Sequence, residues 1–244
     1  MRYGIIADVH GNLEALEVVL QALEGVDRYL YLGDVVGYGP NPNECCAAVR
    51  GLNNCITICG NHDMAAVGKY DVSWFNPYAR AAILWTSGQL SSENRRFLED
   101  LPERYDESSF IMVHGSLVDP VSEYITSPWE ARQSFALLKH PICFIGHTHV
   151  AEYYVQEPDV LTPHQVLLTR GGSIKIRQNQ KYIINCGGVG QPRDGNPKAS
   201  FGIYDAETNE IEIKRVEYPI QKTQDKMIKA GLPAVLYLRL WEGF

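Results

Sequence analysis

The sequence lacks the excess of basic residues that proteins binding long nucleic acids carry. It contains 22 Lys and Arg against 29 Asp and Glu, which gives a formal net charge of −7. A protein that grips the phosphate backbone of a nucleic acid needs a field of positive charge. The composition therefore argues against extended nucleic acid as a partner and against a nuclease, while a local metal site would still attract a single phosphate group.

Long apolar runs and linkers are absent as well. No apolar stretch approaches 18 residues, and Met1–Tyr3 leads directly into a strand pattern with no signal-peptide layout. No Ser-, Gly- or Pro-rich linker divides the 244 residues, of which 45% are hydrophobic. We therefore expect a cytoplasmic protein that forms one domain, residues 1–244, and has no membrane partner.

The sequence has no C-x-x-C pair and no dense cysteine spacing of the kind found in disulfide scaffolds. Most of its six cysteines lie in apolar runs: Cys45, Cys46, Cys55, Cys59, Cys143 and Cys186. A free cysteine in such a run packs as a small hydrophobe. We expect buried, reduced thiols.

What the sequence does contain is a series of short, β-branched apolar runs, a pattern typical of buried strands. The first, Tyr3–Ala7, precedes a helical apolar pattern between Asn12 and Gly25, and the next, Tyr29–Leu32, follows that helix directly. This opening predicts a β-α-β unit with parallel strands. From Val150 onward, short strand-like runs are joined by turns. The predicted fold is α/β, with two packed β-sheets flanked by helices, a β-α-β first half and a largely antiparallel second half.

Several aromatic residues lie between the predicted strands. We read Tyr38, in a loop rich in Gly and Pro, as a surface turn residue, with a place at the edge of a site as the alternative. Trp74, Phe75 and Trp85 are read as core residues, with a cleft wall as the alternative. The last predicted segment, Gln221–Phe244, is expected to pack on its own domain, with pairing to another subunit of a homo-oligomer as the alternative.

Five of the apolar runs end in residues that can bind a metal. These polar pieces are Asp8-Val9-His10, Gly33-Asp34, Gly60-Asn61-His62-Asp63, His114-Gly115 and Gly146-His147-Thr148-His149. One Asp-x-His or His-x-His alone is weak evidence, but five of the seven histidines fall in these pieces. Ligands bind outside the carboxyl ends of the strands in α/β folds. The sequence therefore predicts one site built by several strand ends.

The chemistry and number of these groups favour two metal ions. Carboxylate, amide and imidazole ligands suit manganese, iron, zinc, nickel or cobalt better than magnesium, calcium or a thiolate-seeking metal. Seven groups with one bridging carboxylate imply two ions roughly 3.5–4 Å apart. We predict two divalent transition-metal ions, with manganese first among them. Gly33, Gly60 and Gly146 precede ligands and permit unusual backbone turns and close approach.

The order of these motifs resembles the calcineurin-like metallophosphoesterases over residues 1–149. The later stretch Asn185–Arg193 resembles the Asn-Pro-Gly-Ser-Val-Gly stretch of small bacterial and archaeal phosphodiesterase-like members, with Cys186 and Gly188 where proline and serine are usual. The resemblance implies that His62 lies beside the substrate phosphate, as general acid or transition-state stabiliser, and that Asp63 orients it. It further implies two metal positions that share Asp34, the first completed by Asp8, His10 and His149 and the second by Asn61, His114 and His147.

The resemblance implies a hydrolase of phosphoric esters, a phosphodiesterase or nucleotide-pyrophosphate hydrolase, whose nucleophile is a hydroxide bridging two metals. A phosphomonoesterase or protein phosphatase, and a catalytically silent interaction scaffold, are the alternatives. The expected partner is a small phosphate ester. Arg193 follows a Gly-rich turn and is a candidate phosphate clamp, with a surface arginine as the alternative. Asn12 is a candidate substrate contact, with a helix N-cap as the alternative.

Overall fold

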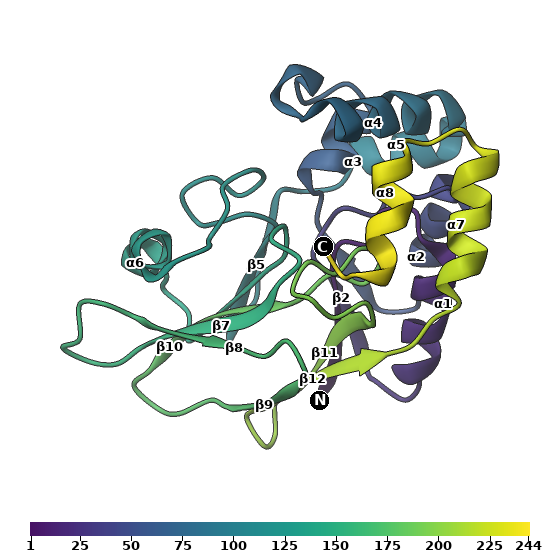
Figure 1. The fold of residues 1–244 in the computed structure, drawn as a ribbon. Coiled ribbons are helices and arrows are strands. Elements are labelled where there is room, and N and C mark those ends of the chain that lie inside the picture. Colours follow the sequence, from purple (N-terminus) through teal and green to yellow (C-terminus); the bar gives the residue numbers. More distant parts are fainter.

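The computed structural model describes residues 1–244 as two six-stranded β-sheets that pack against each other and are flanked by helices (Figure 1). The first sheet has the strand order β3 (Cys55–Thr57), β2 (Arg28–Tyr31), β1 (Arg2–Ile6), β11 (Ala199–Asp205), β12 (Glu210–Val216) and β9 (Gly172–Lys175). The second has the order β4 (Arg104–Asp106), β5 (Phe110–Val113), β6 (Ile142–Ile145), β10 (Lys181–Cys186), β7 (Ala151–Gln156) and β8 (His164–Leu167).

Most helices cover the outer face of the first sheet, whereas α6 (Pro128–Leu137) lies on the second (Figure 1). Those on the first sheet's side are α1 (Leu13–Ala22), α2 (Pro42–Arg50), α3 (Asn61–Ala66), α4 (Pro77–Gln89), α5 (Ser92–Glu99), α7 (Ile220–Lys229) and α8 (Ala234–Leu238). Short 3-10 turns, η1 (Val72–Trp74) and η2 (Arg239–Trp241), precede α4 and follow α8. None of the helices is long and apolar enough to span a lipid bilayer.

Apolar side chains fill the space between these layers. Ile5 and Leu30 of the first sheet meet Phe110, Phe144 and Ile184 of the second in one buried cluster. A larger cluster lies between the first sheet and its helices, and a smaller one lies beneath α6. All six cysteines are free and five are buried, so the prediction of reduced, packed thiols is confirmed.

The predicted two-sheet sandwich is confirmed, and so is the opening β-α-β unit, in which β1 and β2 pair in parallel. The later strands, however, do not form a sheet of their own. β9, β11 and β12 extend the first sheet, while β7, β8 and β10 join the second. Alternating apolar residues identify a strand, but its partner depends on contacts between distant parts of the chain.

The C-terminal segment packs on its own domain, as expected. Met227 of α7 and Leu236 of α8 are buried in the cluster that α1 also lines. Lys226 Nζ lies 2.6 Å from the buried carboxylate of Glu14 on α1, which ties the two helices together. The helical form of this segment, and the short helix α3, were not predicted, because Gly-containing motifs and a mixed apolar tail give no clear helical period.

Candidate metal centre

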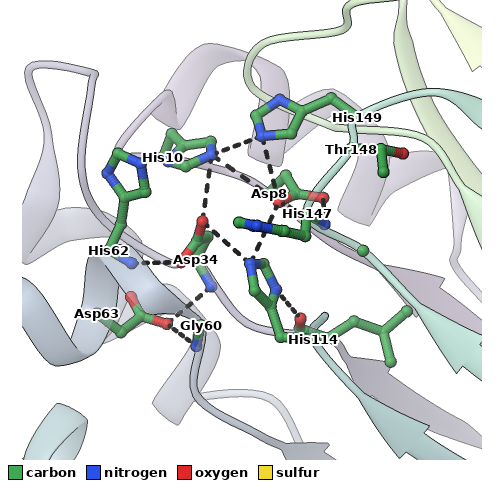
Figure 2. Close-up of polar contacts among 12 residues, drawn as sticks. Asp8, His10, Asp34, Gly60, His62, Asp63, His114, His147, Thr148 and His149 are labelled. Carbon is green, nitrogen blue, oxygen red and sulfur yellow. Dashed lines mark hydrogen bonds and ion pairs between the residues drawn. The ribbon is translucent and has the colours of Figure 1, made fainter. Parts of the chain in front are cut away.

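Six of the seven candidate ligands gather at one edge of the two sheets, where the parallel strands end (Figure 2), and the seventh, Asn61, lines a cavity together with His147. They follow β1 (Asp8 and His10), β2 (Asp34), β3 (Asn61), β5 (His114) and β6 (His147 and His149). All seven side chains are 6% exposed or less. The structure therefore brings together every residue of the predicted ligand set.

Sharp backbone turns aim these side chains inward. Five of the ligands have a positive φ: Asp8 at 55°, His10 at 51°, Asp34 at 57°, His147 at 68° and His149 at 60°. Residues other than glycine rarely adopt this left-handed conformation, and such strain concentrates at functional sites. The turns let several strand ends direct polar groups into one small volume, which straight strands would not do.

Glycines allow the close packing of the site. A Cβ atom on Gly60 would collide with the Asp34 carboxylate, and one on Gly37, whose φ is +140°, would collide with the His62 imidazole. Gly33 has a φ of +90°, which a residue with a side chain adopts only under strain. Backbone and ligand side chains thus approach each other where no other residue would fit.

Asp8, His10 and His149 form the first group of ligand atoms. The Nε2 atoms of His10 and His149 lie 3.0 Å apart, and His149 Nε2 lies 3.4 Å from Asp8 Oδ1. Asp34 Oδ2 is 3.6 Å from His10 Nε2 and therefore borders this group. The donor atoms of Asp8, His10 and His149 lie close enough together to hold one cation, with Asp34 at their border.

The second group shares Asp34. Asp34 Oδ2 lies 3.3 Å from His114 Nε2, and ligand atoms of Asp34, His114 and His147 all lie within 4.8 Å of one another. Asn61 begins α3, which follows β3 after three intervening residues, and its Oδ1 is buried without a hydrogen-bond partner. One Asp34 oxygen thus faces both groups, as a bridging ligand would.

Backbone carbonyls determine which histidine nitrogens carry protons. Nδ1 of His10, His114 and His149 faces the carbonyl oxygen of Val36, Leu32 and Gln191 at 3.2, 2.7 and 2.6 Å. A carbonyl oxygen only accepts, so each Nδ1 donates and each neutral ring keeps a lone pair on Nε2. Such second hydrogen bonds orient metal-binding histidines.

These residues fit a bound metal on structural grounds. His10 Nε2 and His149 Nε2 present lone pairs to each other at 3.0 Å, a repulsive arrangement that a cation between them would relieve. Asn61 Oδ1 is buried without a hydrogen-bond partner, and Asp34 Oδ2 and His114 Nε2, 3.3 Å apart, have no partner outside the candidate ligand set. Buried polar atoms are otherwise almost always paired. The donor set, imidazole with carboxylate and amide oxygen, suits divalent transition metals.

The charges at the site are strongly perturbed. Burial lowers the pKa of His147 to about 3, and it lowers those of His10 and His149 well below their usual value. Burial also opposes protonation of His114, but the Asp34 and Asp8 carboxylates outweigh it and raise the pKa of His114 to about 9. The two carboxylates therefore favour a positive charge at His114, and a bound metal cation would supply that charge in place of a proton.

His62 lies beside both groups and forms a third group of possible ligand atoms with His10 and Asp34. Its ring contacts those of His10, Tyr38 and Phe75, with centroids 4.7, 4.4 and 4.9 Å away. Its backbone N–H donates to Asp34 Oδ1 at 2.9 Å, and its Nδ1 is buried without a partner. Burial lowers the pKa of His62 to about 4, so its imidazole is neutral at pH 7.

Asp63 does not orient His62, so that expectation is wrong. Its carboxylate accepts from the backbone N–H groups of Asp34 at 2.7 Å, Val36 at 3.1 Å and Gly60 at 3.1 Å. Burial and the neighbouring Asp34 raise the pKa of Asp63 to about 7, while these donors favour its charged form. Asp63 holds the loop that carries Asp34.

The structure gives Asn12 the role of a helix N-cap, which was the alternative to a substrate contact. Its Oδ1 accepts from Ala15 N at 3.2 Å and from Thr223 Oγ1 at 2.9 Å, and its Nδ2 donates to Gly190 O at 2.8 Å. The side chain is buried, and its carbonyl and amide groups both have protein partners. Asn12 therefore caps α1 and joins three segments of the fold, rather than contacting a substrate.

Three residues near the metal centre were missed or misread. Tyr38 is 6% exposed, with its ring 4.6 Å from that of His10, so the surface-turn reading is wrong. Tyr124 stacks on His147 at 3.8 Å, and no sequence signal pointed to it. Burial lowers the pKa of Arg239 to about 10, and nearby Arg193 contributes to this shift. A lone cation in the apolar run around η2 was the available signal for Arg239.

Arg193 lies over the edge of the site. Its guanidinium carbon is 5.5 Å from the centre of the Tyr38 ring, and its backbone N–H donates to His149 O at 3.2 Å. Its Nη2 donates to Gln191 Oε1 at 3.1 Å, whereas its Nε is buried without a partner, and no carboxylate forms an ion pair with it. Arg193 is therefore not an ordinary surface arginine.

Comparisons with known proteins agree with this geometry. The family model described as a calcineurin-like phosphoesterase superfamily domain matches residues 1–209. A solved metallophosphoesterase from Sphaerobacter thermophilus is 44% identical, with a TM-score of 0.88 over 100% of this chain and 99% of that one. An uncharacterized protein of Methanocaldococcus jannaschii is 39% identical over 98% of this chain and 97% of its own length.

A shorter match concerns a named enzyme. The symmetrical bis(5'-nucleosyl)-tetraphosphatase of Erwinia tasmaniensis is 33% identical over 70 residues, which are 27% of this chain and 26% of that enzyme. The family match, by contrast, covers most of the chain, and the fold agrees with it. The chain belongs to the calcineurin-like phosphoesterase superfamily and is a hydrolase acting on phosphoric esters.

Proposed function

We propose that this protein is a phosphodiesterase or nucleotide-pyrophosphate hydrolase that works with two divalent transition-metal ions, manganese first among them. Asp8, His10, Asp34 and His149 would hold the first ion, and Asp34, Asn61, His114 and His147 would hold the second. The observation that carries this proposal is the single Asp34 oxygen, which lies 3.6 Å from His10 Nε2 and 3.3 Å from His114 Nε2. A lone carboxylate oxygen between two groups of buried donors is the feature that a two-metal site requires.

The chain's own residues define the rest of the mechanism. When bound, the two ions lower the pKa of a water towards about 7 and offset negative charge on the phosphoryl group. His62, neutral at pH 7 from its lowered pKa, donates a hydrogen bond to a phosphoryl or leaving-group oxygen. Asp63 keeps Asp34 in place through the backbone, and the buried histidines exclude bulk water.

Arg193 is proposed to bind a phosphate oxygen of the substrate. Its Nε is buried without a hydrogen-bond partner. Buried polar groups are otherwise almost always paired, so a phosphate oxygen of the substrate would supply the missing acceptor.

Replacing Arg193 by alanine is expected to raise KM roughly 10- to 100-fold with a smaller change in kcat, since a hydrogen bond to a charged group contributes about 1.5–3 kcal/mol. Steady-state kinetics with and without the substitution measure this effect. Arg132→Ala, on the exposed side of α6, is the matched control and should leave KM unchanged. An Arg193→Ala enzyme with wild-type KM would remove Arg193 from the substrate contacts.

The proposed preference for diesters and pyrophosphates over monoesters is supported by the resemblance of residues 185–193. The Erwinia tasmaniensis enzyme is named as a bis(5'-nucleosyl)-tetraphosphatase, and such substrates belong to the same class. A silent scaffold would be expected to have lost ligands, whereas the set here is complete.

Hydrolysis of an aryl phosphodiester beside the matching monoester tests the proposal. Metal-stripped protein should be inactive, and added Mn²⁺ should restore turnover of the diester more than of the monoester. Preference for the monoester would replace the proposal by a phosphatase function. A folded protein that takes up no manganese, iron or zinc would contradict the metal site itself.

A further inference from the structure

A cavity of about 760 Å³ opens beside the metal centre, and Asn61, His62 and His147 form part of its wall. Most of the remaining wall comes from two loops. The segment between α3 and α4 contributes Tyr70, Trp74 and Phe75, and the loop between β5 and α6 contributes Asp119, Ser122 and Tyr124. Its volume lies within the range of roughly 300–1,000 Å³ typical of small-molecule sites.

Aromatic rings line this cavity and contact the histidines of the metal centre. Phe75 packs edge-on against His62 at 4.9 Å and against Tyr70 at 5.8 Å. On the opposite loop, Tyr124 stacks on His147 at 3.8 Å with an interplanar angle of 27°. If a phosphate group lay at the metal centre, a flat group attached to it would therefore contact these aromatic rings.

Trp74 is the residue that packing does not explain. It is 80% exposed and Tyr124 is 48% exposed, although both are large apolar side chains. The expectation that Trp74 belongs to the core is therefore wrong. Trp85, in contrast, is partly buried against the core. Exposed aromatic residues that cluster around a cavity mark a binding surface.

We propose that this cavity binds the base of a nucleotide whose phosphate group lies at the metal centre, with Trp74 as a stacking surface. The proposal rests on the proposed phosphoesterase function and names its substrate class. Stacking on aromatic residues accepts any nucleobase, because every base has a π-face. Asp71 and Asn76 also line the cavity and present polar groups to the edge of a base.

The charge of the protein favours a small nucleotide over a nucleic acid strand. The net charge is −7, and Lys69 is the sole cationic residue that lines the cavity. Its ammonium group already donates to the Glu99 carbonyl. A strand would need several backbone contacts with cations, whereas one nucleotide needs only the metal centre and the aromatic wall.

Two diesters that differ only in the base test the proposal: the methyl ester of adenosine 5'-monophosphate and the methyl ester of ribose 5-phosphate. Wild-type, manganese-loaded protein should show a lower KM for the adenosine ester. Trp74→Ala should raise that KM roughly 10- to 100-fold, the effect of losing a base–aromatic stack, and should not alter kcat/KM for the ribose ester. Trp74→Phe should retain most of the affinity.

The matched control is Trp129→Ala on α6, a tryptophan that is 65% exposed and does not line the cavity. It should behave as wild type with both esters. Equal KM values for the two esters in wild type, or an equal effect of Trp74→Ala on both, would overturn the base assignment. Turnover would persist in either case, so the phosphoesterase proposal would stand.

Binding of adenosine 5'-monophosphate, followed by tryptophan fluorescence, gives a readout that does not depend on turnover. Stacking on Trp74 should quench emission in the wild type and in Trp129→Phe, and the quenching should be lost in Trp74→Phe. If neither ester is hydrolysed, the proposed function fails. The titration then still shows whether the cavity binds the base next to Trp74. Quenching that persists in Trp74→Phe would overturn the proposal.

Discussion

Replacing Asp34 by asparagine is expected to lower turnover by at least about 10³-fold, because bound metal ions contribute several kcal/mol of transition-state stabilisation. Asparagine keeps the size of the side chain and an oxygen able to accept from the His62 N–H. It loses the negative charge of the oxygen that faces both His10 and His114. Activity with added Mn²⁺ and the metal content after dialysis measure the effect, and we expect the loss of at least one bound ion.

The fold should survive this substitution. Asp34 has a φ of 57°, and asparagine is among the few residues that accept this conformation readily. Thermal unfolding of Asp34→Asn should therefore remain cooperative, which separates loss of the metal from loss of the fold. Asp225→Asn, on the exposed side of α7, is the control for removing one carboxylate. Undiminished activity and metal content in Asp34→Asn would refute the two-metal assignment.

His62→Gln is expected to separate catalysis from metal binding. Turnover should fall roughly 10²–10⁴-fold, the range for a positioned proton donor or acceptor, while both ions stay bound. The reason is that His62 holds Asp34 through its backbone N–H, at 2.9 Å, and that bond does not need the imidazole. Metal content and kcat of the same preparation give the comparison.

A metal-ligand role is the alternative to a catalytic role for His62. His62 also lies with His10 and Asp34 in a group whose ligand atoms are within 4.8 Å of one another. If His62→Gln loses a metal ion along with activity, His62 is a ligand rather than a catalytic residue. His164→Gln, on the exposed strand β8, should retain both metal and turnover.

Residues whose role follows from local chemistry were predictable. Asp8, His10 and the other candidate ligands stood out because each follows a β-branched run and lies in a short motif of metal-binding residue types. Parallel strands end at a common edge, so the convergence of these motifs followed from the fold class. The structure brings them together, with Asp34 between the two groups.

Residues whose role depends on distant neighbours were not predictable in the same way. Asp63 follows His62 directly in sequence. Its carboxylate, however, accepts from the backbone N–H groups of Asp34 and Val36, which lie 29 and 27 residues earlier in the chain. Trp74 has the composition of a core residue, but its exposure depends on how the loop before α4 folds. Arg239 reaches the neighbourhood of Arg193 only because the C-terminal helices fold back over α1.

The sequence by itself determined the family-level fold, and the kinds of candidate metal ligand and their order, because hydrophobic period and residue chemistry are local properties. The tertiary structure decided which strands pair, which polar groups are left without partners and which aromatic rings face the cavity. These depend on contacts between residues far apart in the chain, whose energies no local pattern contains.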